Sequence, residues 1–186
     1  KRTCCVGINN RKAARIAGRL MGQFLGGTGK IAVVSSAIAS ENNNYYVQVR
    51  ETEFADFIHK EYPDIEIITT LDSFEDPQIT YEKTVKLLRD YQDLQGIYIT
   101  CGGVSQVGRA LEESGRAKDI RVISFEDYPE VVDLIRKDVI DCTLAGELQQ
   151  QGEIPVQIIM DYLVFGKEPE QQQIFTDIRV LVKESL

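Results

Sequence analysis

The stretch FLGGTGKIAVVSS, residues 24–36, decides the fold class because it joins a helical pattern to a strand pattern. Residues 13–25 place apolar side chains at helical spacing, and residues 31–34 form an apolar, β-branched run. Gly26 and Gly27 fit the left-handed turn that commonly ends a helix. The stretch therefore predicts a helix that leads through a glycine turn into a buried strand.

The same glycines could be taken for a phosphate-binding loop, and the sequence argues against it. That motif needs G-x-x-x-x-G-K followed by Ser or Thr, between a strand and a helix. Here Phe24 stands at the first glycine position and Ile31 follows Lys30. The order of the elements is also reversed, so we predict a turn and no phosphate site.

The alternation of strand and helix patterns continues through the chain. The expected strands cover residues 3–8, 30–36, 65–71, 96–101, 120–125 and 140–144. The expected helices cover residues 11–25, 46–62, 77–91, 104–114, 129–137 and 149–165. A β-branched tail follows at residues 173–186. Short apolar strands alternating with helices predict an α/β fold, a doubly wound parallel sheet with three αβα layers.

Composition limits the function classes. The 186 residues carry a formal net charge of −8, and Lys and Arg form no concentrated stripe, so the chain itself is a poor nucleic-acid binder. We also see no apolar run of membrane-spanning length and no signal-peptide pattern.

Four cysteines stand in or beside apolar strand patterns, at Cys4, Cys5, Cys101 and Cys142. We interpret them as buried free thiols in preference to disulfides or metal ligands, because no C-x-x-C or Cys/His cluster occurs. Free thiols favour a reducing compartment, so we expect a cytoplasmic location.

No pattern typical of catalysis is found. His59 is the single histidine, Ser35 and Ser36 lie in no G-x-S-x-G elbow, and no G-x-G-x-x-G follows the first strand. We expect a protein that is not an enzyme and that holds neither a metal ion nor a cofactor.

Five phrases resemble the effector-binding domain of the lac repressor family, which shares its fold with periplasmic sugar-binding proteins. They are VGINNRKAARIAGRLMGQFLGGTGKIAVV, RETEFADFI with YPDIEI, YQDLQGIYITCGGVSQVGRALEESG, IRVISFEDYPEVVDLIRKDVID and QQQGEIPVQIIMDYLVFGKEP. The resemblance implies a two-lobed ligand clamp with the second lobe at residues 3–145. Residues 146–186 would be a crossover helix and a C-terminal strand that return to a first lobe, most of which lies outside this chain.

The resemblance also implies a ligand site at the strand ends. Arg50 matches the family arginine whose guanidinium binds ring and hydroxyl oxygens, and Glu126 matches the family's sugar-binding aspartate. The alternative for Arg50 is a solvated residue at a helix start. Three aromatic side chains near these loops are candidates for stacking on a sugar or for ordinary packing: Tyr45, Tyr46 and Tyr128.

Other matched positions depart from the family. Asn9 replaces an Asp, Gly102 begins a Gly-Gly pair where Asn-Asp is usual, and Gly146 replaces a Gln at the crossover. Glu53 stands where a Gly is expected. We include Asn9, Gly102 and Gly146 among the candidate ligand contacts, but two amide side chains are missing, which leaves the ligand class open.

Two functions from different classes follow. The first is the sugar-sensing domain of a lac-repressor-type regulator, a homodimer that binds DNA through a helix-turn-helix outside this chain. The alternative is the solute-binding component of a sugar ABC transporter. A third, less favoured, is a small α/β enzyme. The residues before Lys1 discriminate between the first two, since a helix-turn-helix indicates the regulator and a secretory signal the transporter.

Overall fold

The computed structural model describes residues 4–36 and 45–186 and shows strands and helices in the expected alternation. Thr3, where the sequence predicts the first strand to begin, lies outside the described residues. The strands are β1 (Cys5–Ile8), β2 (Thr28–Ser35), β3 (Asp64–Asp72), β4 (Leu94–Ile99), β5 (Arg121–Phe125), β6 (Cys142–Gly146), β7 (Gln173–Thr176) and β8 (Ile178–Leu181). The helices are α1 (Asn10–Phe24), α2 (Tyr45–Glu61), α3 (Pro77–Asp90), α4 (Val104–Ser114), α5 (Pro129–Arg136) and α6 (Leu148–Phe165), and a short 3₁₀ turn covers Lys183–Ser185.

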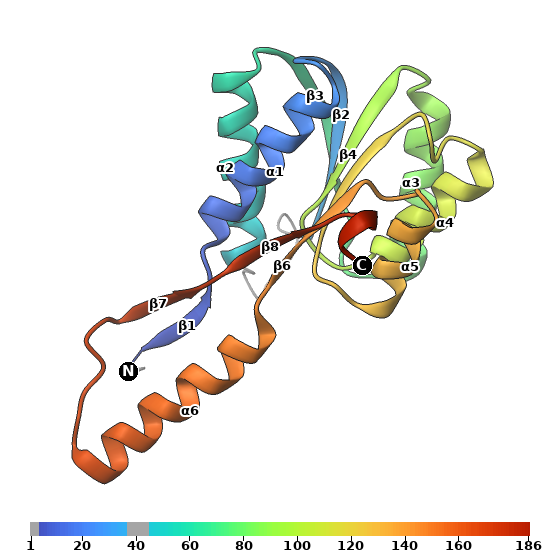
Figure 1. Cartoon of the computed structure of the whole chain (residues 1–186). Helices are drawn as coiled ribbons and strands as arrows, with labels where there is room; N and C mark the ends of the chain where they lie inside the picture. Colours follow the sequence, from blue (N-terminus) through green and yellow to red (C-terminus); the bar gives the residue numbers. More distant parts are fainter. Residues whose placement is uncertain (1–3, 37–44) are drawn as a thin grey trace.

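Six strands form the main sheet in the order β3-β2-β4-β5-β6-β8. Helices α1 and α2 cover one face, and α3, α4 and α5 cover the other (Figure 1). All neighbours are parallel except β6 and β8, which run antiparallel. The predicted α/β fold with three layers is confirmed, with one antiparallel edge strand added.

Strand β2 shows why both faces of the sheet are buried. Successive side chains of a strand point to opposite faces. Ile31 and Val33 therefore join the core beneath α1 and α2, while Ala32 and Val34 join the core beneath α3, α4 and α5. This double burial explains the apolar run without polar alternation in the sequence.

The glycine turn between α1 and β2 has the predicted conformation. Gly26 and Gly27 have φ angles of 64° and 88°, in the left-handed region, and the Gly27 N–H donates to the Gly22 carbonyl at 2.9 Å. This closes the last turn of α1, so the phosphate-loop alternative is wrong and the turn only redirects the chain.

Helices α1 and α2 pack closely because two glycines face aromatic rings. A Cβ added to Gly18 would lie 2.7 Å from Phe57 Cδ1, and one added to Gly22 would lie 2.2 Å from Tyr62 Cε2. Both distances are shorter than carbon atoms tolerate. The two glycines thus let the rings of α2 and its C-terminal end rest on the α1 backbone.

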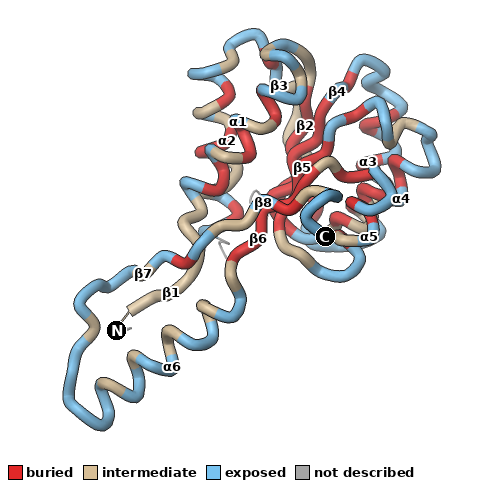
Figure 2. The backbone as a smooth tube through the Cα atoms, viewed as in Figure 1, coloured by how far each residue is buried: buried red, intermediate tan, exposed pale blue. Residues whose placement is uncertain are grey.

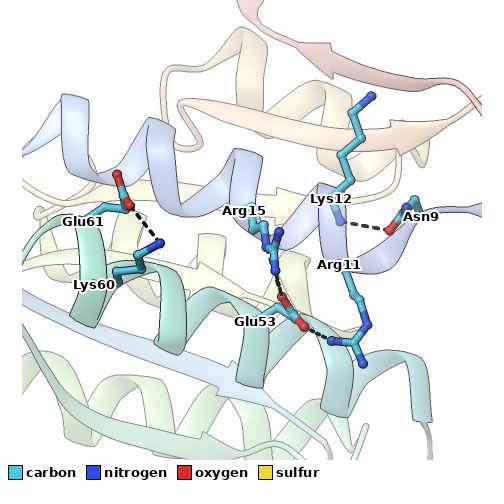
Figure 3. Close-up of polar contacts among 7 residues, drawn as sticks. All are labelled: Asn9, Arg11, Lys12, Arg15, Glu53, Lys60 and Glu61. Atoms are coloured by element: carbon cyan, nitrogen blue, oxygen red, sulfur yellow. Dashed lines mark hydrogen bonds and ion pairs between the residues drawn. The ribbon is translucent and has the colours of Figure 1, made fainter.

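A carboxylate also joins these helices. Glu53 of α2 is 8% exposed and accepts hydrogen bonds from Arg11 and Arg15 of α1 (Figure 3). The Arg15 Nε atom lies 3.1 Å from Glu53 Oε2. Glu53, the departure from the family's glycine, therefore connects α1 to α2.

Three aromatic rings stack in the core under the carboxyl ends of the central strands. Phe54 and Tyr98 are stacked with ring centroids 4.1 Å apart, and Phe125 lies 6.0 Å from Tyr98 in a tilted arrangement. Tyr98 is fully buried, and its hydroxyl has no hydrogen-bond partner among the described residues. Burial strongly raises the pKa of this hydroxyl, so the ring remains neutral.

A second unit of structure extends from the main sheet. β1 pairs with β7 in a separate two-stranded parallel sheet, and α6 lies next to it (Figure 1). β7 and β8 are separated by Asp177 alone, so one extended segment passes from the small sheet into the main sheet.

The two sheets thus divide the chain differently from the predicted lobes at residues 3–145 and 146–186. The sequence predicts β1 in the second lobe and the tail in the first, whereas β1 lies in the small sheet and β8 of the tail pairs in the main sheet. The pattern of single strands does not reveal this, because strand pairing is a long-range property.

Helix α6 has no buried residue, and Figure 2 shows it as exposed or intermediate along its length. Its exposed apolar side chains are Leu148, Val156, Ile159, Met160, Tyr162, Leu163, Val164 and Phe165. Contiguous apolar surface of this kind is unusual on a monomer and indicates a surface that another element covers. Helix α6 therefore still requires an apolar partner, which agrees with the expectation that it returns to a first lobe.

All four cysteines are free thiols, as predicted. Cys101 and Cys142 are buried, but Cys4 and Cys5 are only half-buried because they lie in and beside β1 of the small sheet. Burial raises the pKa of Cys142 to about 12, which keeps this thiol protonated at neutral pH. No group of three or more metal-ligating side chains occurs within residues 4–36 and 45–186. No helix in these ranges is long and apolar enough to cross a membrane.

The Glu53 contact predicts a measurable effect on stability. We expect Glu53→Ala to lower the free energy of unfolding by about 1–2 kcal/mol, because two arginines lose their hydrogen bonds to a buried carboxylate. Both arginines are exposed to water, which limits the size of the effect. Urea denaturation of the chain measures it. Glu61→Ala is the control and should cost less, because the Glu61 carboxylate, which pairs with Arg19 and Lys60, is more exposed than that of Glu53. Equal costs for both variants would contradict the assignment.

The Tyr98 hydroxyl predicts a substitution that stabilises the protein. We expect Tyr98→Phe to raise the free energy of unfolding by about 1 kcal/mol, because it removes a buried polar group without a partner and preserves the ring. Thermal and urea unfolding check this. Tyr98→Leu, which also deletes the stacking, should destabilise the chain. A loss of stability in Tyr98→Phe would show that the hydroxyl has a partner.

Candidate functional site

A small cavity of about 210 Å³ lies at the carboxyl ends of β5 and β6, beside β1 of the small sheet. Ligands of open α/β sheets bind at this edge, where the parallel strands end. The cavity is lined by Cys5, Val6, Gly7, Ile8, Asn10, Tyr46, Arg50, Glu126, Gly146, Gln151 and Gln173. It therefore lies between the main sheet and the small sheet.

Arg50 is the central charged group of this cavity. Its side chain is only 12% exposed, and its guanidinium carbon lies 3.9 Å from the centroid of the Phe125 ring. The ring belongs to the aromatic stack of the core, so a rigid apolar surface supports the cation.

Polar contacts orient the guanidinium within its plane. Arg50 Nε donates to Asn10 Oδ1 at 2.6 Å, and Nη1 donates to the Thr100 carbonyl at 3.1 Å. Burial lowers the pKa of Arg50 from its ordinary value, while Glu126 acts in the opposite direction. An arginine remains charged under these conditions, so the site keeps a fixed donor fork.

Glu126 lies at the other side of this cation. Its Oε1 atom is 3.6 Å from Arg50 Nη2, and its side chain is 36% exposed. This contact is longer than a normal hydrogen bond, so the carboxylate can still accept donors from a ligand.

The backbone of Glu126 is unusual and is held in place. Its φ angle of 69° is in the left-handed region, which a residue with a side chain seldom adopts. The Glu126 N–H donates to the Leu144 carbonyl at 2.9 Å, and Thr143 Oγ1 donates to the Glu126 carbonyl at 2.7 Å. Backbone strain of this kind concentrates at ligand sites.

The structure brings together three of the five predicted site residues. Arg50, Glu126 and Gly146 all line the cavity. Asn9 does not, because its side chain accepts the Lys12 N–H at 3.0 Å and caps α1 (Figure 3). Gly102 is exposed, and a Cβ placed on it would meet nothing within 4 Å.

Sequence reasoning missed the neighbour of Asn9. Asn10, one residue later, lines the cavity and contacts Arg50. The N-cap preference of asparagine does not separate the two, because a helix predicted to begin at residue 11 would take Asn10 as its cap. Gln151 and Gln173 also line the cavity, and no local pattern points to them.

The three candidate stacking residues differ in whether they line the cavity. Tyr46 lines the cavity, and its hydroxyl lies 3.7 Å from Cys5 Sγ. Tyr45 packs edge-on against Tyr46 and is 58% exposed, and Tyr128 is 64% exposed. Tyr46 is thus the one of the three that is placed to contact a ligand in this cavity.

A larger hollow of about 340 Å³ lies elsewhere, between α6 and the loop that follows it. Ile158, Ile174 and Pro169 line it together with Lys167, Glu168 and Glu170. It has no buried charged group, and it adjoins the exposed apolar surface of α6. The smaller cavity at Arg50 is therefore the candidate site.

Solved structures of similar fold are sugar-binding proteins. The first is GanP, a glucose-galactose binding protein from Geobacillus stearothermophilus, with 24% identity and a TM-score of 0.87 over 100% of this chain and 64% of that chain. The second is the sugar-binding protein of a sugar ABC transporter from Bacillus halodurans, with 27% identity and a TM-score of 0.87 over 98% and 64%. The third is an ABC transporter solute-binding protein from Burkholderia graminis in complex with D-arabinose, with 22% identity and a TM-score of 0.88 over 98% and 63%.

The chain thus spans less than two thirds of the length of these structures. No curated protein matches its sequence. A family match covers residues 1–168, which is most of the chain. The chain therefore belongs to the family of periplasmic binding protein domains.

Proposed function

We propose that this chain contributes one lobe to the sugar-binding component of an ABC transporter. The observation that carries the proposal is the buried Arg50 at the strand ends, fixed on Phe125 and surrounded by groups that bind hydroxyls. Its structural neighbours named above are sugar-binding proteins, and two of them serve ABC transporters.

The charges of the cavity favour a neutral ligand. Among the described residues that line it, Arg50 is the one cationic residue, and Glu126 lies beside it as the one anionic residue. The other polar side chains are amides and a hydroxyl group, from Asn10, Gln151, Gln173 and Tyr46, with the Cys5 thiol beside them. A phosphorylated sugar would meet Glu126 without a second cation, whereas a neutral sugar offers hydroxyl donors to it.

The size of the cavity fits one wall of a larger site. About 210 Å³ is below the roughly 300–1,000 Å³ of complete small-molecule pockets. The chain also spans 64% of the GanP structure. We infer that the rest of the first lobe, outside this chain, packs on the apolar surface of α6, and that the two lobes close on the ligand by a hinge motion.

The regulator hypothesis stays a prediction. It implies a homodimer, a cytoplasmic location and DNA contact through a helix-turn-helix outside this chain. The transporter proposal implies export of the protein from the cytoplasm. The sequence of the gene before Lys1 discriminates between them, since a secretory signal supports the transporter and a helix-turn-helix supports the regulator.

The site predicts sugar binding that depends on Arg50. We expect isothermal titration of the full-length protein with D-glucose, D-galactose, D-arabinose and D-fucose to find a ligand among them. Arg50→Ala should weaken its binding by about 10- to 100-fold, since charged hydrogen bonds contribute about 1.5–3 kcal/mol. Glu126→Gln should weaken it less, because an amide still accepts a hydrogen bond.

Arg109→Ala is the matched control, because Arg109 is an exposed arginine that pairs with Glu113 on α4 away from the cavity. Circular dichroism verifies that each variant is folded. Unchanged affinity in a folded Arg50→Ala protein would contradict the site, and absence of binding to every neutral sugar would contradict the function.

A further inference from the structure

Gly146 ends β6 at the wall of the cavity, and another side chain occupies the space next to it. A Cβ added to Gly146 would lie 2.3 Å from Gln151 Nε2 and 2.5 Å from Ile8 Cγ2. No residue with a side chain fits at position 146 without displacing both neighbours. The Gln151 carboxamide thus lies where a side chain at position 146 would begin.

Three consecutive glutamines in the first turns of α6 have different environments. Gln149 Nε2 donates to Glu153 Oε1 at 2.7 Å, and Gln150 both donates to Asp177 Oδ2 and accepts from the Asp177 N–H, each at 3.2 Å. Neither of them lines the cavity. The first two carboxamides therefore have partners within the fold.

Gln151 differs from both. Its side chain lines the cavity and is half-buried, and it has no hydrogen-bond partner in the described part of the chain. Its backbone N–H donates to the Glu147 carbonyl at 3.0 Å, which fixes its place in the first turn of α6. A carboxamide has two donors and an acceptor, so its bonding capacity is directed toward a ligand.

We propose that Gln151 is a specificity-determining ligand contact, which supplies from α6 the amide that Gly146 lacks. The inference rests on the proposed function and names a further residue of the same site. A carboxamide both donates and accepts, as does a sugar hydroxyl, so Gln151 selects a neutral saccharide with a hydroxyl at this wall.

The position of Gln151 also differs in kind from that of Arg50. Arg50 belongs to α2, which packs on the main sheet, whereas Gln151 belongs to α6 beside the small sheet. A sugar bound by both residues would connect the two units across the crossover at Glu147. Binding through Gln151 would thus restrain the crossover as well as select the ligand.

A substitution series separates this role from simple packing. Gln151→Met retains the length of the side chain and removes its hydrogen bonds, while Gln151→Ala removes both. Isothermal titration of the full-length protein uses whichever of D-glucose, D-galactose, D-arabinose or D-fucose binds best. We expect about a tenfold loss of affinity in both variants and none in the control Gln149→Ala.

Deoxy analogues of that sugar test the selectivity. With the wild-type protein, one monodeoxy analogue should lose about tenfold in affinity, and in Gln151→Met the same analogue should bind as well as the parent sugar. This pattern assigns the hydroxyl that Gln151 contacts.

The outcomes distinguish the inference from the function on which it rests. If Gln151→Met binds the sugar with wild-type affinity, the inference is overturned, because Met then replaces a side chain that only fills space. This holds whether or not Gln151→Ala loses affinity. If Arg50→Ala still weakens binding in that case, the proposed function stands. If no sugar binds the wild-type protein, both are overturned.

Discussion

The site depends on one buried cation. Arg50 reaches the carboxyl edge of the sheet from α2, and its guanidinium lies on the Phe125 ring, which the Tyr98 and Phe54 rings support from within the core. Burying a charge is costly unless partners replace the lost water, and here Asn10, Thr100 and Glu126 provide them. These partners come from α1 and from the ends of β4 and β5, so the cation contacts all three segments at the site.

The architecture follows from local signals that agree with one another. Apolar runs for strands, helical spacing for helices and glycines at the turn after α1 all point to the same alternation, which is why the fold was predictable. Helix α4 (Val104–Ser114) coincides with its predicted bounds, and its end at Gly115, with φ of 71°, is a local property of that residue. The separation of β1 from the main sheet was not predictable, since it depends on pairing with β7 more than 160 residues later.

The site was predictable only in part, because some of its residues are placed by local patterns and others by long-range packing. Arg50 lies in α2 and Glu126 follows β5, and both line the one cavity at which the family resemblance predicts a ligand. Asn9 failed by one residue because a local hydrogen bond to the Lys12 N–H competes for its side chain. The sequence does not point from Gly146 to Gln151, because the two residues belong to different elements, β6 and α6. Only the short distance between the Gln151 side chain and the Cβ position of Gly146 shows that they are neighbours.

The contacts around the cavity lie close to the three places where the chain passes between the two sheets. Asn9 joins β1 to α1, Glu147 joins β6 to α6, and Asp177 joins β7 to β8. The last two are connected, since the Glu147 N–H donates to the Asp177 carbonyl at 3.3 Å and Arg179 contacts both Glu147 and Asp127. Under the proposed function, a ligand in this cavity would lie next to these crossovers. It would therefore bind better to one relative position of the two units and shift the population toward it.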